Sequence, residues 1–140
     1  TSAIHNMPSD MMINHLTGYI DEKMRLHLKD GIVPIDITKI FEKYHIRDEA
    51  VFDESEKCVK LEGKRIEMYF PPEHAMLSDE PDEGYFQGHI SSIIYKGDHY
   101  NYRILSKNEI EYSVDDEYLW NIGDYVSVIV PEKIMEFKVL

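Results

Sequence analysis

Side chains that could catalyse a reaction or bind a metal are numerous in this chain, but no known catalytic or metal-binding spacing joins them. The 140 residues include 27 Asp and Glu, 7 His and 1 Cys. No two histidines are spaced to share a helix face, as a helical zinc site needs. Cys58 lies in a strand-like stretch of alternating charge, which favours a packing thiol over a nucleophile. Residues 79–84 resemble a calcium loop, but Pro81 and Ile90 occupy ligand positions. We therefore expect no catalytic, cofactor-binding or metal-binding residue here.

Nucleotide-binding motifs are missing as well. Gly63-Lys64 lacks the upstream Gly and the following Ser or Thr of a phosphate-binding loop, and no Gly-x-Gly-x-x-Gly sequence occurs. The formal net charge is −12, with no basic cluster. Because phosphate backbones and anionic lipids are bound through Lys and Arg, this charge argues against nucleic acid and membrane surfaces as partners. No apolar run approaches the length of a membrane span.

One short pattern occurs twice: an apolar run that ends in Pro-Glu and is followed by an apolar pair. The two glutamates lie 132 − 73 = 59 residues apart. Proline cannot donate to a sheet ladder, so each copy should end a strand, as in a β unit that is partly duplicated. We expect each Glu to accept backbone donors at the following bend. The alternative is that these residues face a partner protein; the candidate interface residues are Pro72, Glu73, His74, Pro131, Glu132 and Lys133.

Short strands at near-regular spacing predict an all-β barrel or sandwich. The one helix expected lies near residues 36–45, where Ile37, Ile40, Phe41 and Tyr44 share a face, and it is followed by an acidic loop. A hairpin is expected between residues 58–61 and 65–70. The acidic connector at 79–84 divides the chain into a first β subdomain, 13–78, and a C-terminal barrel module, 84–140.

The clearest predicted hairpin spans residues 85–106. Apolar residues share one parity in its two strands, which requires Ile94 opposite Tyr100 and Ile90 opposite Ile104. That register needs an odd-length loop around Lys96-Gly97-Asp98. A slip of one residue would place Asn101 in the core.

Four segments, in order, resemble a known family: the C-terminal regulatory domain of ABC importer ATPase subunits, most closely that of spermidine/putrescine importers. The first segment, 6–14, is similar to the family's S-P-x-M-N passage, and residues 72–76 follow its R-P-E element, with Pro71 in place of the usual Arg. Residues 88–100 are similar to its glycine-flanked hairpin, and 120–132 to its closing W-x-x-G-D segment. Residues 36–57 are longer than the corresponding family stretch.

This resemblance implies an OB-like β-barrel on the cytoplasmic face of a transporter, with residues 1–12 as the linker from a missing ATPase domain. It implies that the parent chain hydrolyses ATP with Mg²⁺ in that missing domain. The present segment would be non-catalytic: it would pair with its twin in a homodimer and contact its own ATPase domain and the membrane subunits. The chain begins with Thr, so we expect it to be part of a longer protein.

Two other functions remain open. A small-ligand sensor that inhibits transport would use the acidic charge and a cage of Tyr85, Tyr95, Tyr100 and Tyr102 to hold a polyamine. An OB-fold module that binds nucleic acid fits the fold, but it needs a positive groove lined with aromatics.

Overall fold

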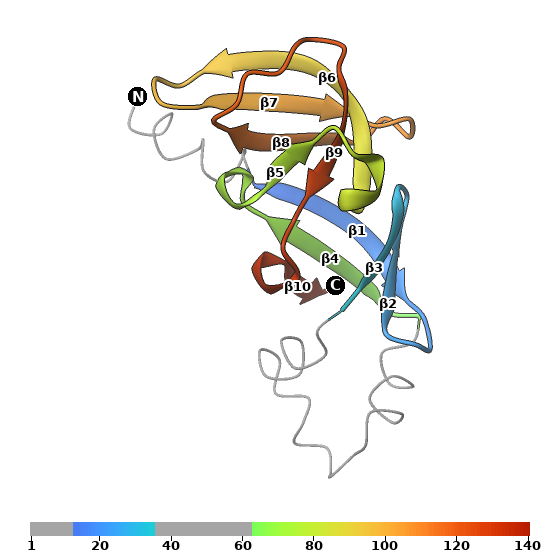
Figure 1. Ribbon diagram of the computed structural model, residues 1–140. Helices are drawn as coiled ribbons and strands as arrows, with labels where there is room; N and C mark the ends of the chain where they lie inside the picture. The colour runs from blue at the N-terminus through green and yellow to red at the C-terminus, as the bar shows by residue number, and fades with distance from the viewer. Residues whose placement is uncertain (1–12, 36–62) are drawn as a thin grey trace.

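A computed structural model describes residues 13–35 and 63–140, which form two five-stranded antiparallel sheets (Figure 1). Strands follow the order β10-β4-β1-β2-β3 in the first sheet and β5-β9-β6-β7-β8 in the second. The all-β, OB-like fold predicted from the sequence is confirmed. The strand bounds are β1 Asn14–Ile20, β2 Arg25–Leu28, β3 Gly31–Pro34, β4 Arg65–Phe70, β5 Met76–Ser78, β6 Phe86–Tyr95, β7 Tyr100–Leu105, β8 Glu111–Asp116, β9 Tyr125–Ile129 and β10 Glu136–Val139.

Alternation of apolar and polar residues explains which face of each strand is buried. In β4, Ile66, Met68 and Phe70 are fully buried while the residues between them are not. The two sheets share one core, because the Phe70 ring of the first sheet lies 6.5 Å from the Phe86 ring of the second. Phe86 in turn stacks on Tyr112, with 5.0 Å between ring centroids.

The two sheets have equivalent topologies. In each sheet one edge strand comes from the other half of the chain: β10 in the first sheet and β5 in the second. Strands β1 to β4 have the same relative order as β6 to β9. After β4 the chain crosses through a 3-10 helix, η2 (Pro72–His74), into β5 of the second sheet. After β9 it crosses through η4 (Glu132–Ile134) into β10 of the first sheet. A third 3-10 helix, η3 (Pro81–Glu83), precedes β6.

The repeated Pro-Glu pattern therefore marks the two crossovers between sheets. Both strands end before the proline, as predicted, since β4 ends at Phe70 and β9 at Ile129. The structural equivalence, however, has a spacing of 60 residues, because Pro71 and Pro131 are the N-cap residues of η2 and η4. The counterpart of Glu73 is thus Lys133, and the pairing of Glu73 with Glu132 at 59 residues is wrong by one position.

The hairpin of β6 and β7 has the predicted register at one end only. Ile90 lies opposite Ile104, but Ile94 lies opposite Asn101, because a β-bulge shifts the register between Ile90 and Ser92. The bulge turns Ile94 outward. It also leaves Asn101 buried, where its Nδ2 donates to the Ser113 hydroxyl at 2.8 Å. The expected exclusion of Asn101 from the interior is therefore wrong, since its amide finds polar partners there.

Three other predictions have different outcomes. The first strand of the hairpin expected between 58–61 and 65–70 lies outside the described residues, and the second strand, β4, pairs with β1 on one edge and β10 on the other. The helix near 36–45 lies outside the described residues. The division into 13–78 and 84–140 stays a prediction, and each sheet contains one strand from the other segment. Among the described residues, no helix is long and apolar enough to cross a membrane.

Candidate functional site

The six candidate interface residues occupy the two crossovers. Glu73, His74, Glu132 and Lys133 are exposed, and Pro72 is buried. Each turn is closed by backbone hydrogen bonds: the carbonyl of Pro71 accepts from the N–H of His74, and that of Pro131 from Ile134. No backbone N–H of the described residues donates to the carboxylate of Glu73 or Glu132, so the expected capping role of these glutamates is wrong. The role of the six as an interface stays a prediction.

The two crossovers have different surroundings, despite their equivalent topology. The hydroxyl of Tyr85, just before β6, donates to Glu132 Oε1 at 3.3 Å. Burial, with the charge and the hydrogen bond of Glu132, raises the pKa of Tyr85. Glu73 instead lies beside the end of β8, where it borders an acidic hollow.

This acidic hollow has a volume of about 210 Å³ and is lined by residues from three segments: η2, the turn between β6 and β7, and the end of β8. His99 is its one basic group. The Nδ1 atom of His99 lies 2.6 Å from Asp98 Oδ1, and its Nε2 lies 3.7 Å from Asp115 Oδ2. The hydrogen bond with His99 is the main cause that lowers the pKa of Asp98. The lining residues are Glu73, Asp98, His99, Asp115, Asp116 and Glu117.

Two of the acidic residues also hold the barrel together. The N–H of Leu77 in β5 donates to Asp116 Oδ2 at 3.2 Å, which connects the two edge strands of the second sheet. Asp115 Oδ1 accepts from the amide of Asn101 at 2.9 Å. These carboxylates are fixed in place before any ligand binds.

The predicted tyrosine cage is formed only in part. Tyr95 and Tyr100 have ring centroids 5.3 Å apart, and Tyr100 pairs across the sheet with Asp116, which lines the acidic hollow. Tyr102 is fully buried and has a structural role. Its hydroxyl donates to the Tyr118 backbone carbonyl at 2.6 Å and accepts from the backbone N–H of Trp120 at 2.8 Å. Tyr85 belongs to the other crossover, so it is not part of a cage with the other three.

The junction between the sheets depends on two polar residues that the sequence analysis did not single out for a role. Asn14 is buried in β1, and its side chain binds both the N–H and the C=O of Ser113 in β8, at 2.7 and 2.8 Å. Asp30 accepts from the hydroxyls of Ser106 and Tyr112. The one sequence signal for Asn14 was its position as the last residue of segment 6–14, which is similar to the family's S-P-x-M-N passage.

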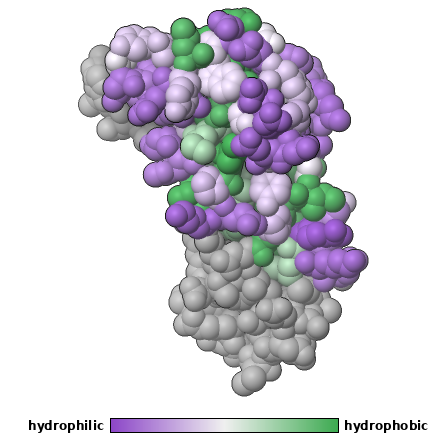
Figure 2. Space-filling model, viewed as in Figure 1, coloured by the Kyte–Doolittle hydropathy of each residue, from purple (hydrophilic) through white to green (hydrophobic). Residues whose placement is uncertain are grey.

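Among residues 13–35 and 63–140, no group of three or more His, Cys, Asp or Glu is arranged to hold a metal ion. Hydrophilic side chains cover most of the described surface on the face shown in Figure 2, and apolar residues form small separate patches there. The exposed side chains of the crossovers are charged or imidazole groups, and the acidic hollow is lined by carboxylates and His99.

Comparison with known proteins agrees with the family resemblance. The chain is 24% identical over 122 residues to the spermidine/putrescine import ATP-binding protein PotA of Bacteroides fragilis, and 30% identical over 81 residues to PotA of Bacteroides thetaiotaomicron. The chain resembles the ATP-binding proteins of spermidine/putrescine importers. These matches cover 85% and 54% of the chain, but only 26% and 17% of the length of the two relatives. No protein-family model matches.

A solved structure is similar in fold. The cytoplasmic molybdate-binding protein ModG superposes with a TM-score of 0.62 over 91% of this chain and 96% of its own, at 11% sequence identity. At this identity the likeness establishes the fold alone. It agrees with an OB-like architecture in which two equivalent β units are combined in one chain.

Proposed function

We propose that this chain is the regulatory and dimerisation part of the ATP-binding subunit of an ABC importer for polyamines. In this proposal the segment has no catalytic residue and no cofactor of its own. ATP and Mg²⁺ bind in a separate ATPase domain of the longer protein. The segment lies on the cytoplasmic face of the membrane, where it contacts its ATPase domain and the membrane subunits.

The similarity to two PotA proteins is the observation that carries this proposal. The fold supports it, because exchange of β5 and β10 makes the two barrels depend on each other. Glu73, His74, Glu132 and Lys133 are exposed at the two crossovers and are the residues that we assign to the contact between copies.

Sedimentation velocity of the 140-residue chain over a range of concentrations tests the pairing. We expect a monomer–dimer equilibrium that the double variant Glu73→Lys, Lys133→Glu shifts toward monomer. Lys23→Glu, at an exposed turn away from the crossovers, makes one of the same charge changes and should leave the equilibrium unchanged. A monomer at every concentration would contradict pairing through this segment alone.

The link to polyamine import needs a transport measurement. In cells of the source organism, deletion of this segment from the longer protein should lower the uptake of radiolabelled putrescine. The uptake of an unrelated amino acid serves as the control. Unchanged putrescine uptake would contradict the assignment to this importer class.

The acidic hollow supports a second function, that of a polyamine sensor. Five carboxylates and His99 surround it, and the Tyr95–Tyr100 pair lies at the same end of the barrel. A polyamine would place ammonium groups on the carboxylates and its methylenes on the rings. Calorimetry with spermidine at moderate salt tests this function, with Asp98→Asn as the weakened variant. Absence of heat and of any thermal shift would exclude it.

Binding of nucleic acid is the least supported of the three functions. The OB-like fold is compatible with it, but the chain carries 27 acidic against 15 basic residues. Single-strand binding needs a positive groove lined with aromatics. We expect no retention of a single-stranded oligonucleotide in a filter-binding assay at low salt.

A further inference from the structure

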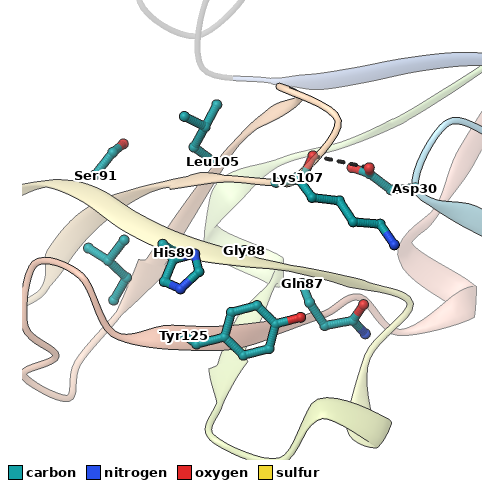
Figure 3. Close-up of a pocket in the computed structure, with 10 residues that line it drawn as sticks. Asp30, Gln87, Gly88, His89, Ser91, Leu105, Lys107 and Tyr125 are labelled. Carbon is teal, nitrogen blue, oxygen red and sulfur yellow. Dashed lines mark hydrogen bonds between the residues drawn. The ribbon is translucent and has the colours of Figure 1, made fainter.

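Two hollows of similar size lie on the two sheets, one in each half of the chain. The hollow over Gly88 has a volume of about 400 Å³ and is shown in Figure 3. The hollow over Gly18 has a volume of about 410 Å³. The first is lined mainly by Gln87, Gly88, His89, Leu105, Lys107 and Tyr125, and the second by Thr17, Gly18, Tyr19, His27, Lys29 and Arg65.

Strand register shows that the two hollows are equivalent positions of the duplicated fold. Gly18 lies opposite Ile66 in β4, and Gly88 lies opposite Val126 in β9. Ile66 and Val126 are 60 residues apart. The same offset relates the two crossovers. One residue further along, Tyr19 is flanked by Arg65 and His27, just as His89 is flanked by Tyr125 and Leu105.

Glycine forms the floor of each hollow because the neighbouring strand comes too close for a side chain. A Cβ atom at Gly18 would lie 2.0 Å from the carbonyl oxygen of His27, and one at Gly88 would lie 2.4 Å from that of Leu105. Each hollow therefore lies over a position that a residue with a Cβ could occupy only if the neighbouring strand shifted. What differs between the two hollows is the side chains around them.

The walls of the Gly88 hollow are apolar and aromatic, and they face solvent. Tyr125 is 51% exposed and Leu105 is 43% exposed. The rings of His89 and Tyr125 have centroids 5.0 Å apart and are tilted by 57°. Figure 3 shows the His89 and Tyr125 rings side by side below the glycine strand. Such walls suit a flat ring, which can pack on the neighbouring rings of Tyr125 and His89.

The polar groups around the Gly88 hollow favour an anion. Within the described part of the chain, neither the Lys107 ammonium nor the Tyr125 hydroxyl has a hydrogen-bond or ion-pair partner. Asp30, the one carboxylate of the lining, is already occupied, because its oxygens accept from Ser106, Asn108 and Tyr112. Lys107 therefore leaves an unpaired positive charge beside the hollow, although the net charge of the chain is −12.

We propose that the hollow over Gly88 binds a small molecule made of a flat aromatic ring that carries a carboxylate or a phosphate. The ring packs on Tyr125 and His89, and the anionic group accepts hydrogen bonds from Lys107 and the Tyr125 hydroxyl. The hollow over Gly18 is a second site of the same class, with Lys29 and Arg65 as the cations and Tyr19 as the aromatic wall. Neither site includes the crossovers or the acidic hollow, so this proposal is independent of the proposed function.

Amide chemical shifts of the uniformly ¹⁵N-labelled 140-residue chain test the proposal, since Gly88 and Gly18 report separately on the two hollows. The probes are benzoate and phenyl phosphate, each titrated to 20 mM at constant ionic strength. We expect saturable shifts at both glycines. The probe that binds more tightly identifies the preferred anionic group. Acetate and inorganic phosphate lack the ring, and benzamide lacks the charge. Acetate and benzamide should bind at least about threefold more weakly than benzoate, and inorganic phosphate at least about threefold more weakly than phenyl phosphate.

Variants assign the contacts to each hollow. Lys107→Gln should weaken binding at Gly88 by about three- to tenfold and leave the response of Gly18 unchanged. Lys96→Gln removes an exposed lysine outside both hollows and should change neither. No saturable shift at Gly88, or equal binding by wild type and Lys107→Gln, would overturn the proposal. Equal binding of acetate and benzoate would overturn the part assigned to the ring.

Discussion

Asn14 is the residue whose substitution should reveal most directly how the two sheets are joined. Its side chain binds the N–H and the C=O of Ser113 across 99 residues of sequence, and so covers the free edge of β8. Asn14 is 6% exposed and Ser113 is 5% exposed. Asn14→Ala would leave both backbone groups of Ser113 buried without a partner.

The expected loss of stability follows from these two groups. A buried donor or acceptor without a partner costs about 1–3 kcal/mol, so the two together should lower the free energy of unfolding by about 2–6 kcal/mol. A chain of this size is typically stable by roughly 7–20 kcal/mol. The variant should therefore fold, with a transition midpoint at least about 4 °C lower.

Urea unfolding followed by the fluorescence of Trp120, the single tryptophan, measures the effect. Trp120 is partly buried against the core, so its emission should report the transition. Asn121→Ala is the matched control, because the Asn121 side chain is exposed, and it should change stability by about 0.5 kcal/mol or less. A loss below about 1 kcal/mol for Asn14→Ala would refute the reasoning that this side chain joins the sheets.

Three further predictions concern other contacts of the fold. Gly18→Ala should lower the free energy of unfolding by about 1–3 kcal/mol in the same urea assay, because its Cβ would lie 2.0 Å from a carbonyl oxygen; a neutral effect would show that β1 and β2 can separate freely. Tyr112→Phe should cost about 1.5–3 kcal/mol, since it removes a hydrogen bond to the carboxylate of Asp30, and an unchanged unfolding midpoint would contradict the role of this pair. Burial works against ionisation of Asp21, but hydrogen bonds from His27, from the backbone of Arg25 and Lys23 and from the Arg25 side chain hold its pKa well below the usual range. This carboxylate therefore stabilises the fold above about pH 4 and loses that effect as the pH falls toward its folded pKa, so the stability difference between wild type and Asp21→Asn should shrink on acidification; a constant difference between pH 6 and pH 3 would refute it.

Local pattern was sufficient to predict several elements of the fold. The short strands expected at near-regular spacing are present in both sheets. The prolines after Phe70 and Val130 end their strands because proline removes a ladder donor, which is a property of the residue itself. The family resemblance could also be recognised from the sequence, because each of its motifs is a short continuous segment.

Features that depend on distant neighbours were predicted poorly. The register of β6 and β7 needs a bulge at Ser91, and the partner that accommodates Asn101 lies on β8. The two crossovers look like strand ends in the sequence, and only the sheet pairing identifies them as exchanges between barrels. The capping role expected of Glu73 and Glu132 failed for the same reason, because backbone carbonyls already satisfy those turns.

The sequence by itself determined the all-β class, the acidic surface and the places where strands stop, because each depends on residue type and short-range order. The tertiary structure decided which strands share a sheet, that two glycines 70 residues apart form equivalent floors, and that Asn14 contacts Ser113. These features arise from pairing across long separations. Many registers satisfy the same local pattern there, and the shared core selects one of them.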